Sequence, residues 1–249
     1  MQYAILFLPL LGAIFGYSAK YFSDLFSQLI TTLFVCISAI LSIIVFYNGI
    51  FHENYGNYLV FQWISSGNFI ANWSINIDPL SSIMLVIVSL ISALVHIYSI
   101  GYMDHDPNKP RFMSYLSLFT FAMMVLVVSD NFLQLFFGWE GVGLSSYLLI
   151  GFWYKKDSAN KAAIKAFIVN RAGDFGFVIA LFLIFLFFGT LNYNEVFQLV
   201  PIFAEKEINF LGFDANLITL ICLFLFIGAM GKSAQDRKST RLNSSHTSI

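Results

Sequence analysis

Residues 138–146 read Gly-Trp-Glu-Gly-Val-Gly-Leu-Ser-Ser, and they place one carboxylate, that of Glu140, in an otherwise uncharged run from 132 to 153. A helix needs about 20 apolar residues to cross a bilayer, and this run has about that length. At about 1.5 Å per residue, Glu140 lies well inside the hydrocarbon layer. A charge there costs roughly 2.5–3.5 kcal/mol on insertion scales, so we expect Glu140 to face protein or water. The same stretch contains small residues that let a neighbouring helix approach closely: Gly138, Gly141, Gly143, Ser145 and Ser146.

The composition predicts an all-α, multi-pass membrane protein. Of the 249 residues, 58% are hydrophobic and 11% are charged, which is too little polar surface to cover a soluble domain of this length. Cys36 and Cys222 have no metal-like spacing, so ligand count excludes an iron–sulfur cluster or a zinc site. The net charge of −1 gives no indication of nucleic-acid binding. The first apolar run has no basic flank and no cleavage site, so we expect no cleavable signal peptide.

Seven apolar segments predict a bundle of about seven transmembrane helices. They cover residues 3–17, 25–47, 80–102, 112–129, 132–153, 159–188 and 215–230. Lys and Arg are concentrated in alternate connections, which predicts that the N-terminus lies outside. The outer loop 48–78 alternates polar and apolar residues, which favours a small hairpin. Asp78-Pro79, with Ser81 beyond, indicates a helix start.

Four more ionisable side chains lie within the later apolar segments, and together with Glu140 they suggest a proton relay. Arg171 and Asp174 are three residues apart, so they share a helix face and can neutralise each other. Lys165 lies about 240° around the helix from Arg171, and Lys232 lies deep in the seventh segment. Burial favours the neutral forms of a Glu–Lys pair and proximity favours the ionised forms, so a pair of varying separation can exchange protonation states.

Each of these residues also has a purely structural interpretation. Glu140 can serve as a hydrogen-bond partner of a neighbouring helix, and Lys232 can extend toward the inner interface. Arg171 and Asp174 can form an ion pair that only supports the fold. We expect His96, late in the third segment, to form a local hydrogen bond.

Residues 236–249 differ in character from the rest of the chain. They contain no aromatic residue and no amphipathic pattern, and residues 236–246 resemble the translated read-through of a short-read sequencing adapter. We therefore expect the native protein to continue beyond Gln235 and exclude this tail from the fold.

Several motifs resemble one family, the antiporter-like subunit L (subunit 5) of proton-pumping NADH:quinone oxidoreductase, respiratory complex I. They are residues 138–153, Lys165-Ala-Phe, Asn170-Arg-Ala-Gly-Asp174 and Gly231-Lys-Ser-Ala-Gln235. The resemblance implies two inverted five-helix repeats with broken helices, cut here within the first repeat. The implied parts are three helices in 1–111, including the outer loop 48–78, a partial proton-translocating repeat in 112–235, and the tail 236–249.

The resemblance further implies a translocase subunit whose relay consists of Glu140, Lys232, Asp174, Arg171 and Lys165. No cofactor is expected in this chain, and the NAD, flavin, iron–sulfur and quinone sites are expected in other subunits. The implied partners are other membrane subunits, the antiporter-like subunit M among them, and the lipid bilayer, with no nucleic acid. A bacterial inner membrane is favoured over the mitochondrial one. Two alternatives stay open: a sodium/proton antiporter subunit of the same superfamily, and a structural membrane subunit without an ion path.

Overall fold

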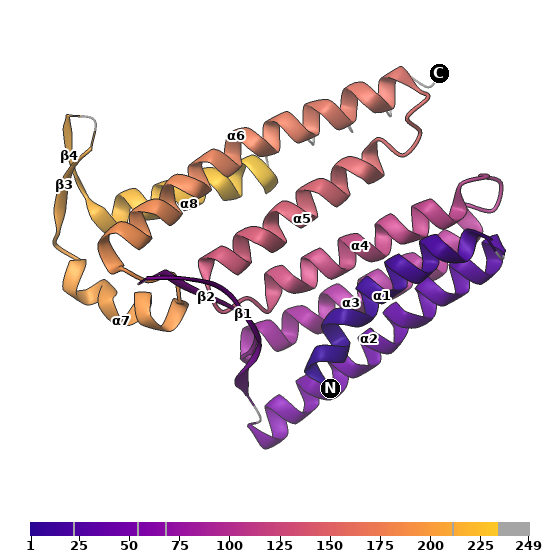
Figure 1. Ribbon diagram of the computed structural model, residues 1–249, viewed down its shortest axis with the longest axis horizontal. Coiled ribbons are helices and arrows are strands. Elements are labelled where there is room, and N and C mark those ends of the chain that lie inside the picture. Colours follow the sequence, from indigo (N-terminus) through magenta and orange to yellow (C-terminus); the bar gives the residue numbers. More distant parts are fainter. Residues whose placement is uncertain (22, 54, 68, 211, 234–249) are drawn as a thin grey trace. The chain divides into compact units, whose positions relative to one another are not determined.

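The chain forms two compact units in a computed structural model that describes residues 1–21, 23–53, 55–67, 69–210 and 212–233. The first unit joins residues 1–65 to 71–152, and the second joins 66–70 to the chain from Trp153 onward. Each unit has helices that pack on one another (Figure 1).

The first unit is a bundle of five helices and most of a two-stranded sheet, whose residues 66–70 belong to the second unit (Figure 1). Its elements are α1 (Gln2–Ser18), a 3-10 turn (Ala19–Tyr21), α2 (Asp24–His52), β1 (Gly56–Ser66), β2 (Phe69–Ile77), α3 (Pro79–Tyr102), α4 (Lys109–Val127) and α5 (Phe132–Ile150). α1 packs against α2 and α4, α3 packs against α2 and α4, and α5 packs against α4. The hairpin predicted within 48–78 is confirmed as β1 and β2.

The hairpin closes one end of the first unit with a shared apolar core. Trp73, Ile75 and Ile77 of β2 are buried there. They belong to the same cluster as Ile5 of α1 and Met124 of α4. Burial of large apolar side chains is the main stabilising contribution to such a junction, and it fixes the sheet on the helix ends.

The third predicted helix begins where the sequence indicated. The Asp78 carboxylate accepts a hydrogen bond from Ser81 N at 2.6 Å, and Ser81 Oγ accepts one from Asp78 N at 2.7 Å. Together they form a capping box, with Pro79 as the first residue of α3.

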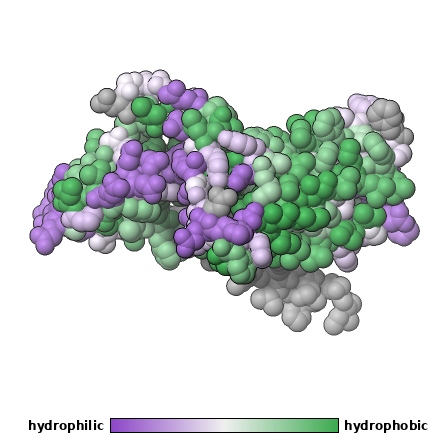
Figure 2. Space-filling model, turned by 90° about the horizontal axis from the view of Figure 1, so that it is seen from below, coloured by the Kyte–Doolittle hydropathy of each residue, from purple (hydrophilic) through white to green (hydrophobic). Residues whose placement is uncertain are grey.

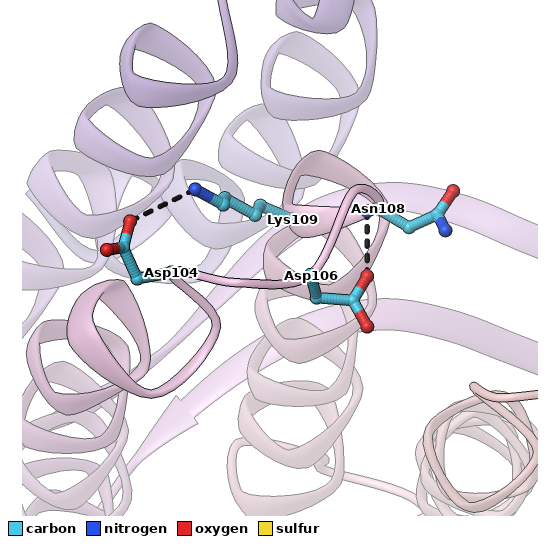
Figure 3. Close-up of polar contacts among 4 residues, drawn as sticks. All are labelled: Asp104, Asp106, Asn108 and Lys109. Atoms are coloured by element: carbon cyan, nitrogen blue, oxygen red, sulfur yellow. Dashed lines mark hydrogen bonds and ion pairs between the residues drawn. The ribbon is translucent and has the colours of Figure 1, made fainter.

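The connection from α3 to α4 is closed by polar contacts outside the apolar segments (Figure 3). Lys109 Nζ lies 3.1 Å from Asp104 Oδ1, and Asn108 N donates to Asp106 Oδ1 at 2.7 Å. The hydrogen bond from Lys109 holds the pKa of the Asp104 carboxyl below its ordinary value of 3.8.

The second unit consists of three helices and a short hairpin. Its elements are α6 (Asp157–Phe188), α7 (Tyr193–Phe203), β3 (Glu207–Phe210), β4 (Phe213–Asn216) and α8 (Leu217–Ser233). α6 packs against α8, and α7 contacts both. The sequence prediction did not include α7, β3 or β4. At 11 residues, α7 is too short to cross a bilayer, so it adds a helix to the fold but no membrane span.

The predicted class, a membrane protein made mainly of helices, is confirmed. Each of the seven predicted segments corresponds to a helix, and five of these are long and apolar enough to span a membrane: α1, α2, α3, α4 and α6. The apolar helix α8 is shorter, and the 19-residue helix α5 is not among these five.

The surface carries broad apolar areas, shown in green in Figure 2. On α2 and α3, exposed side chains such as Leu33, Ile40, Ile91 and Leu94 contribute to the apolar exterior. A soluble monomer rarely exposes so much contiguous apolar surface, and lipid contact accounts for it.

Two predictions about domain organisation are not tested by how the helices pack. The predicted division into 1–111 and 112–235 concerns repeats of the family. The compact units instead divide the chain between residues 152 and 153, with 66–70 also in the second unit, so the predicted division stays a prediction. The predicted non-native tail, 236–249, lies outside the described residues.

Candidate functional site

Glu140 lies near the middle of α5, beside a close contact between α5 and α4. A Cβ atom added at Gly138 would lie 2.6 Å from Leu126 N, and one added at Gly141 would lie 3.0 Å from Ala122 Cβ. Only glycine leaves room for this approach, so the predicted role of these two small residues is confirmed, and the neighbouring helix is α4. Glu140 itself is half-buried and lies about 100° around α5 from Gly141.

Side-chain hydrogen bonds to the hairpin hold the N-terminal end of α5. Asn131 caps the helix, with its Oδ1 accepting from Gln134 N at 2.8 Å, and its Nδ2 donates to Asn72 O at 2.9 Å. Gln134 is fully buried, and its Oε1 accepts from Ser74 N at 3.0 Å while its Nε2 donates to Ser74 O at 2.7 Å. The side-chain amide thus pairs with the backbone of β2 in the way that the backbone of a neighbouring strand would. These bonds fix the rotation and height of the helix that carries Glu140.

The other end of α5 is attached to α4. Arg111 Nη2 donates to Phe152 O at 2.9 Å, and the guanidinium carbon lies 4.6 Å from the centre of the Phe152 ring. A charge-assisted hydrogen bond and a cation–π contact to one residue hold the chain just after α5 in place. Both ends of α5 are therefore held within the first unit.

Arg171 and Asp174 form an ion pair in the middle of α6. Arg171 Nη1 lies 3.9 Å from Asp174 Oδ2, so the contact predicted from their spacing is present. The Asp174 side chain is 9% exposed and that of Arg171 is 46% exposed. The guanidinium also lies 4.9 Å from the centre of the Phe167 ring, so one face of α6 holds an aromatic ring, a cation and a carboxylate in sequence.

Glycines bring α6 and α8 into direct backbone contact next to these charges. A Cβ added at Gly173 would lie 2.9 Å from Gly231 Cα, and one added at Gly231 would lie 2.7 Å from Gly173 Cα. Because Asp174 follows Gly173 and Lys232 follows Gly231, the carboxylate and the half-buried lysine both flank this contact. Close helix approach through small residues is typical of membrane interfaces.

The remaining predicted residues are placed as follows. Lys165 is exposed in the N-terminal half of α6, and Asn170 beside Arg171 is buried. Glu140 belongs to the first unit, whereas Lys165, Arg171, Asp174 and Lys232 belong to the second, so the pairing of Glu140 with Lys232 stays a prediction. In the ranges that the structure describes, no three His, Cys, Asp or Glu side chains are arranged to hold a metal ion.

Sequence reasoning missed the polar contacts around the start of α5. Asp130, Asn131 and Gln134 are all buried, and Asp130 Oδ2 accepts from Asn57 Nδ2 of β1 at 2.9 Å. The available signal was an Asn three residues before a Gln at the start of an apolar run, which is a helix-capping pattern. The local hydrogen bond expected for His96 is confirmed, since its Nδ1 lies 2.8 Å from Ser92 O.

Two known families match the sequence. Residues 63–113 match the family described as "NADH-Ubiquinone oxidoreductase (complex I), chain 5 N-terminus". Residues 129–237 match the family described as "NADH:quinone oxidoreductase/Mrp antiporter, TM". The second match contains Glu140, Lys165, Arg171, Asp174 and Lys232.

Curated relatives align with nearly the whole chain. NADH-ubiquinone oxidoreductase chain 5 of Chondrus crispus is 50% identical over 237 residues, which are 94% of this chain and 35% of that protein. NADH-quinone oxidoreductase subunit L of Rickettsia felis is 50% identical over 232 residues, which are 93% of this chain and 36% of that protein. The chain thus spans about a third of the length of these relatives.

Solved structures share the fold. The membrane-bound sulfane sulfur reductase, an archaeal respiratory membrane complex, contains a chain that aligns with a TM-score of 0.75 at 15% identity, covering 92% of this chain and 44% of that one. The Mrp complex of a Dietzia species aligns with a TM-score of 0.67 at 20% identity, covering 91% of this chain and 24% of that one. At these identities the likeness concerns the fold alone. From the two family matches and the curated relatives, the chain belongs to the complex I antiporter-like family that comprises NADH-quinone oxidoreductase subunit L and NADH-ubiquinone oxidoreductase chain 5.

Proposed function

We propose that this chain works in a proton-translocating membrane subunit of an NADH:quinone oxidoreductase, respiratory complex I. The observation that carries the proposal is the Arg171–Asp174 ion pair in the middle of α6, next to the backbone contact with the helix that bears Lys232. Ionisable side chains inside apolar helices are costly, and in membrane proteins they mark proton and ion pathways. The 50% identity to curated proteins named for this enzyme supports the same assignment.

In this proposal, Glu140 and Lys232 are a coupled acid and base. An opposite charge nearby favours the ionised forms of both groups, and its withdrawal favours the neutral forms, so a change in their separation moves a proton. Arg171 and Asp174 provide a second pair of charges that competes for Glu140 and Lys232. Lys165 is a further relay position on α6.

The energy for translocation comes from other subunits in this proposal. NADH oxidation and quinone reduction occur there, together with the NAD, flavin, iron–sulfur and quinone sites. The neighbouring antiporter-like subunit M is a proposed partner. The basic connections between alternate helices support an orientation with the N-terminus outside, in a bacterial inner membrane.

The proposal is tested with Glu140→Gln in the full-length subunit, assembled in complex I in inverted membrane vesicles. Glutamine keeps the size and polarity of the side chain but cannot ionise, so proton pumping should be lost while the complex still assembles. Glu207→Gln is the matched control, because Glu207 lies exposed on β3. It should pump like the unmodified protein. Normal NADH-driven pumping by the Glu140→Gln complex would refute the role of Glu140.

A second candidate is a sodium/proton antiporter subunit of the same superfamily. It is supported by the family description that includes the Mrp antiporter and by the shared fold with the Mrp complex. Sodium-driven proton movement in vesicles without any dependence on NADH would favour it. Proton movement that requires NADH and ignores sodium would favour the complex I assignment.

A further inference from the structure

The contact between α2 and α3 places three polar side chains at neighbouring levels in the first unit. Val35 and Ala39 of α2 pack against Ala93 of α3 in one buried cluster. The two helices run in opposite directions, since the hairpin joins the end of α2 to the start of α3 (Figure 1). Moving three residues back along α2 reaches Thr32, and moving three residues forward along α3 reaches His96. Both steps go in the same direction in space, so Thr32 and His96 lie within about one helical turn of each other along this contact.

Gln28 lies one turn further along the same face of α2. All three side chains are buried: Gln28 is 3% exposed, Thr32 8% and His96 0%. Within the described residues, Gln28 Nε2, Thr32 Oγ1 and His96 Nε2 are inaccessible to solvent and have no hydrogen-bond partner. Buried polar atoms of this kind are rare in folded proteins, and three at adjacent levels of one helix contact require a common explanation.

The histidine ring has a defined polarity. His96 Nδ1 lies 2.8 Å from the Ser92 carbonyl oxygen of its own helix. A carbonyl oxygen only accepts hydrogen bonds, so Nδ1 carries a proton, and in the neutral ring Nε2 presents a lone pair. Because Nδ1 faces the backbone of α3, Nε2 on the opposite side of the ring points away from it. Around the axis of α3, His96 lies between Ala93 and Ser92. Ala93 faces α2, and Ser92 faces α4, since its Oγ lies 2.5 Å from Thr120 Oγ1 of that helix.

The three atoms are chemically complementary to water. Gln28 Nε2 can only donate, His96 Nε2 can only accept, and the Thr32 hydroxyl can do both. A water molecule accepts from the amide and donates to the imidazole, and buried waters in proteins typically make about three such bonds. Leaving each polar atom unpaired would instead cost about 1–3 kcal/mol per group.

From this arrangement we infer that α2 and α3 hold a buried water-binding site formed by Gln28, Thr32 and His96. Its ligand is water, with His96 Nε2 as the acceptor and Gln28 Nε2 as the donor. The site is separate from the residues assigned to proton translocation and lies entirely in the first unit. It gives a membrane-embedded histidine a hydrogen-bonded contact with water.

The test is a set of electron cryo-microscopy maps of complete complex I with the full-length subunit, at a resolution that shows ordered water elsewhere. The unmodified complex should show water density within hydrogen-bond distance of His96 Nε2 and Thr32 Oγ1. Thr32→Val removes the hydroxyl at nearly constant shape and should abolish that density. Thr31→Val is the matched control, because Thr31 Oγ1 already donates within its own helix, to Ser27 O and Gln28 O. This variant should keep the water.

Absence of density in the unmodified complex, or density that survives Thr32→Val, would overturn the inference. A second measurement needs no variant at position 32. In nuclear magnetic resonance spectra of a complex labelled with ¹⁵N-histidine, magnetisation should pass from water to the ring of His96. The signal of that ring is identified as the one that disappears in His96→Gln. If the His96 signal is visible in the spectrum but receives no magnetisation from water, the inference is also overturned.

Discussion

Gly173→Ala should force α6 and α8 apart at the point where their backbones touch. The added Cβ would lie 2.9 Å from Gly231 Cα and 3.4 Å from Gly228 O. Non-bonded carbons settle at about 3.5–4.0 Å, so the helices must separate by roughly 0.6–1.1 Å. Both facing atoms belong to the backbone, so no side chain can rotate away. Overpacking costs about 1–3 kcal/mol, and alanine recovers about 0.5–1 kcal/mol over glycine in a helix, which leaves a net loss of about 0–2.5 kcal/mol.

The assay is thermal unfolding of the full-length subunit, followed by proton pumping of the assembled complex. We expect a lower unfolding temperature and weaker pumping, because the separation displaces Lys232 relative to Asp174. Gly101→Ala is the control, since a Cβ added there meets no atom within 4 Å, and it should be neutral or stabilising. Gly173→Ala combined with Gly231→Ala should cost less than the sum of the single changes, because the first change already makes room for the second. A Gly173→Ala variant as stable and active as the Gly101→Ala variant would refute the contact.

Three further predictions concern polar contacts of single residues. In thermal unfolding, Arg171→Leu should destabilise the subunit by about 1–3 kcal/mol more than Asp174→Leu. The first change removes the positive charge beside a buried carboxylate, whereas the second removes the negative charge beside a half-exposed guanidinium. Equal losses of stability would contradict this. Gln134→Leu should cost about 2–4 kcal/mol, since it removes both hydrogen bonds to Ser74, and limited proteolysis should then cut the hairpin 56–77 faster; unchanged cleavage would exclude the anchoring role. Because the pKa of Asp104 is lowered in the folded state, its bond to Lys109 stabilises above the ordinary pKa of 3.8, and this contribution disappears as the pH falls through the lowered value. Asp104→Asn should therefore lower the unfolding temperature slightly at pH 7, and this effect should shrink as the pH falls below 3.8; an effect that grows as the pH falls would contradict the assignment.

Local signals in the sequence predicted most helices and their starts. Apolar length defines a membrane helix because every backbone polar group must be satisfied internally, so the seven runs correspond to seven helices. Asp78 and Pro79 fix the start of α3 through bonds that span only three residues. The Arg171–Asp174 contact is likewise a consequence of helical spacing alone.

Features that depend on distant parts of the chain were not predictable in the same way. The small residues around Glu140 indicated close packing, but no local pattern identifies α4 as the partner. The contact of Gly173 with Gly231 joins residues far apart in sequence, as does the bonding of Gln134 to Ser74. The helix α7 lacks the length of a membrane segment, so a search for long apolar runs passes over it. The proposed coupling of Glu140 with Lys232 stays a prediction for the same reason.

The attachment of α5 at both ends has a mechanical consequence. Near one end, Gln134 is bonded to the hairpin, and just beyond the other end Phe152 is bonded to Arg111 of α4. The middle of α5 is held as well, because Gly138 and Gly141 pack directly against α4 beside Glu140. With contacts at both ends and in the middle, α5 cannot bend without disrupting one of them, so the carboxylate moves only together with the rest of the first unit.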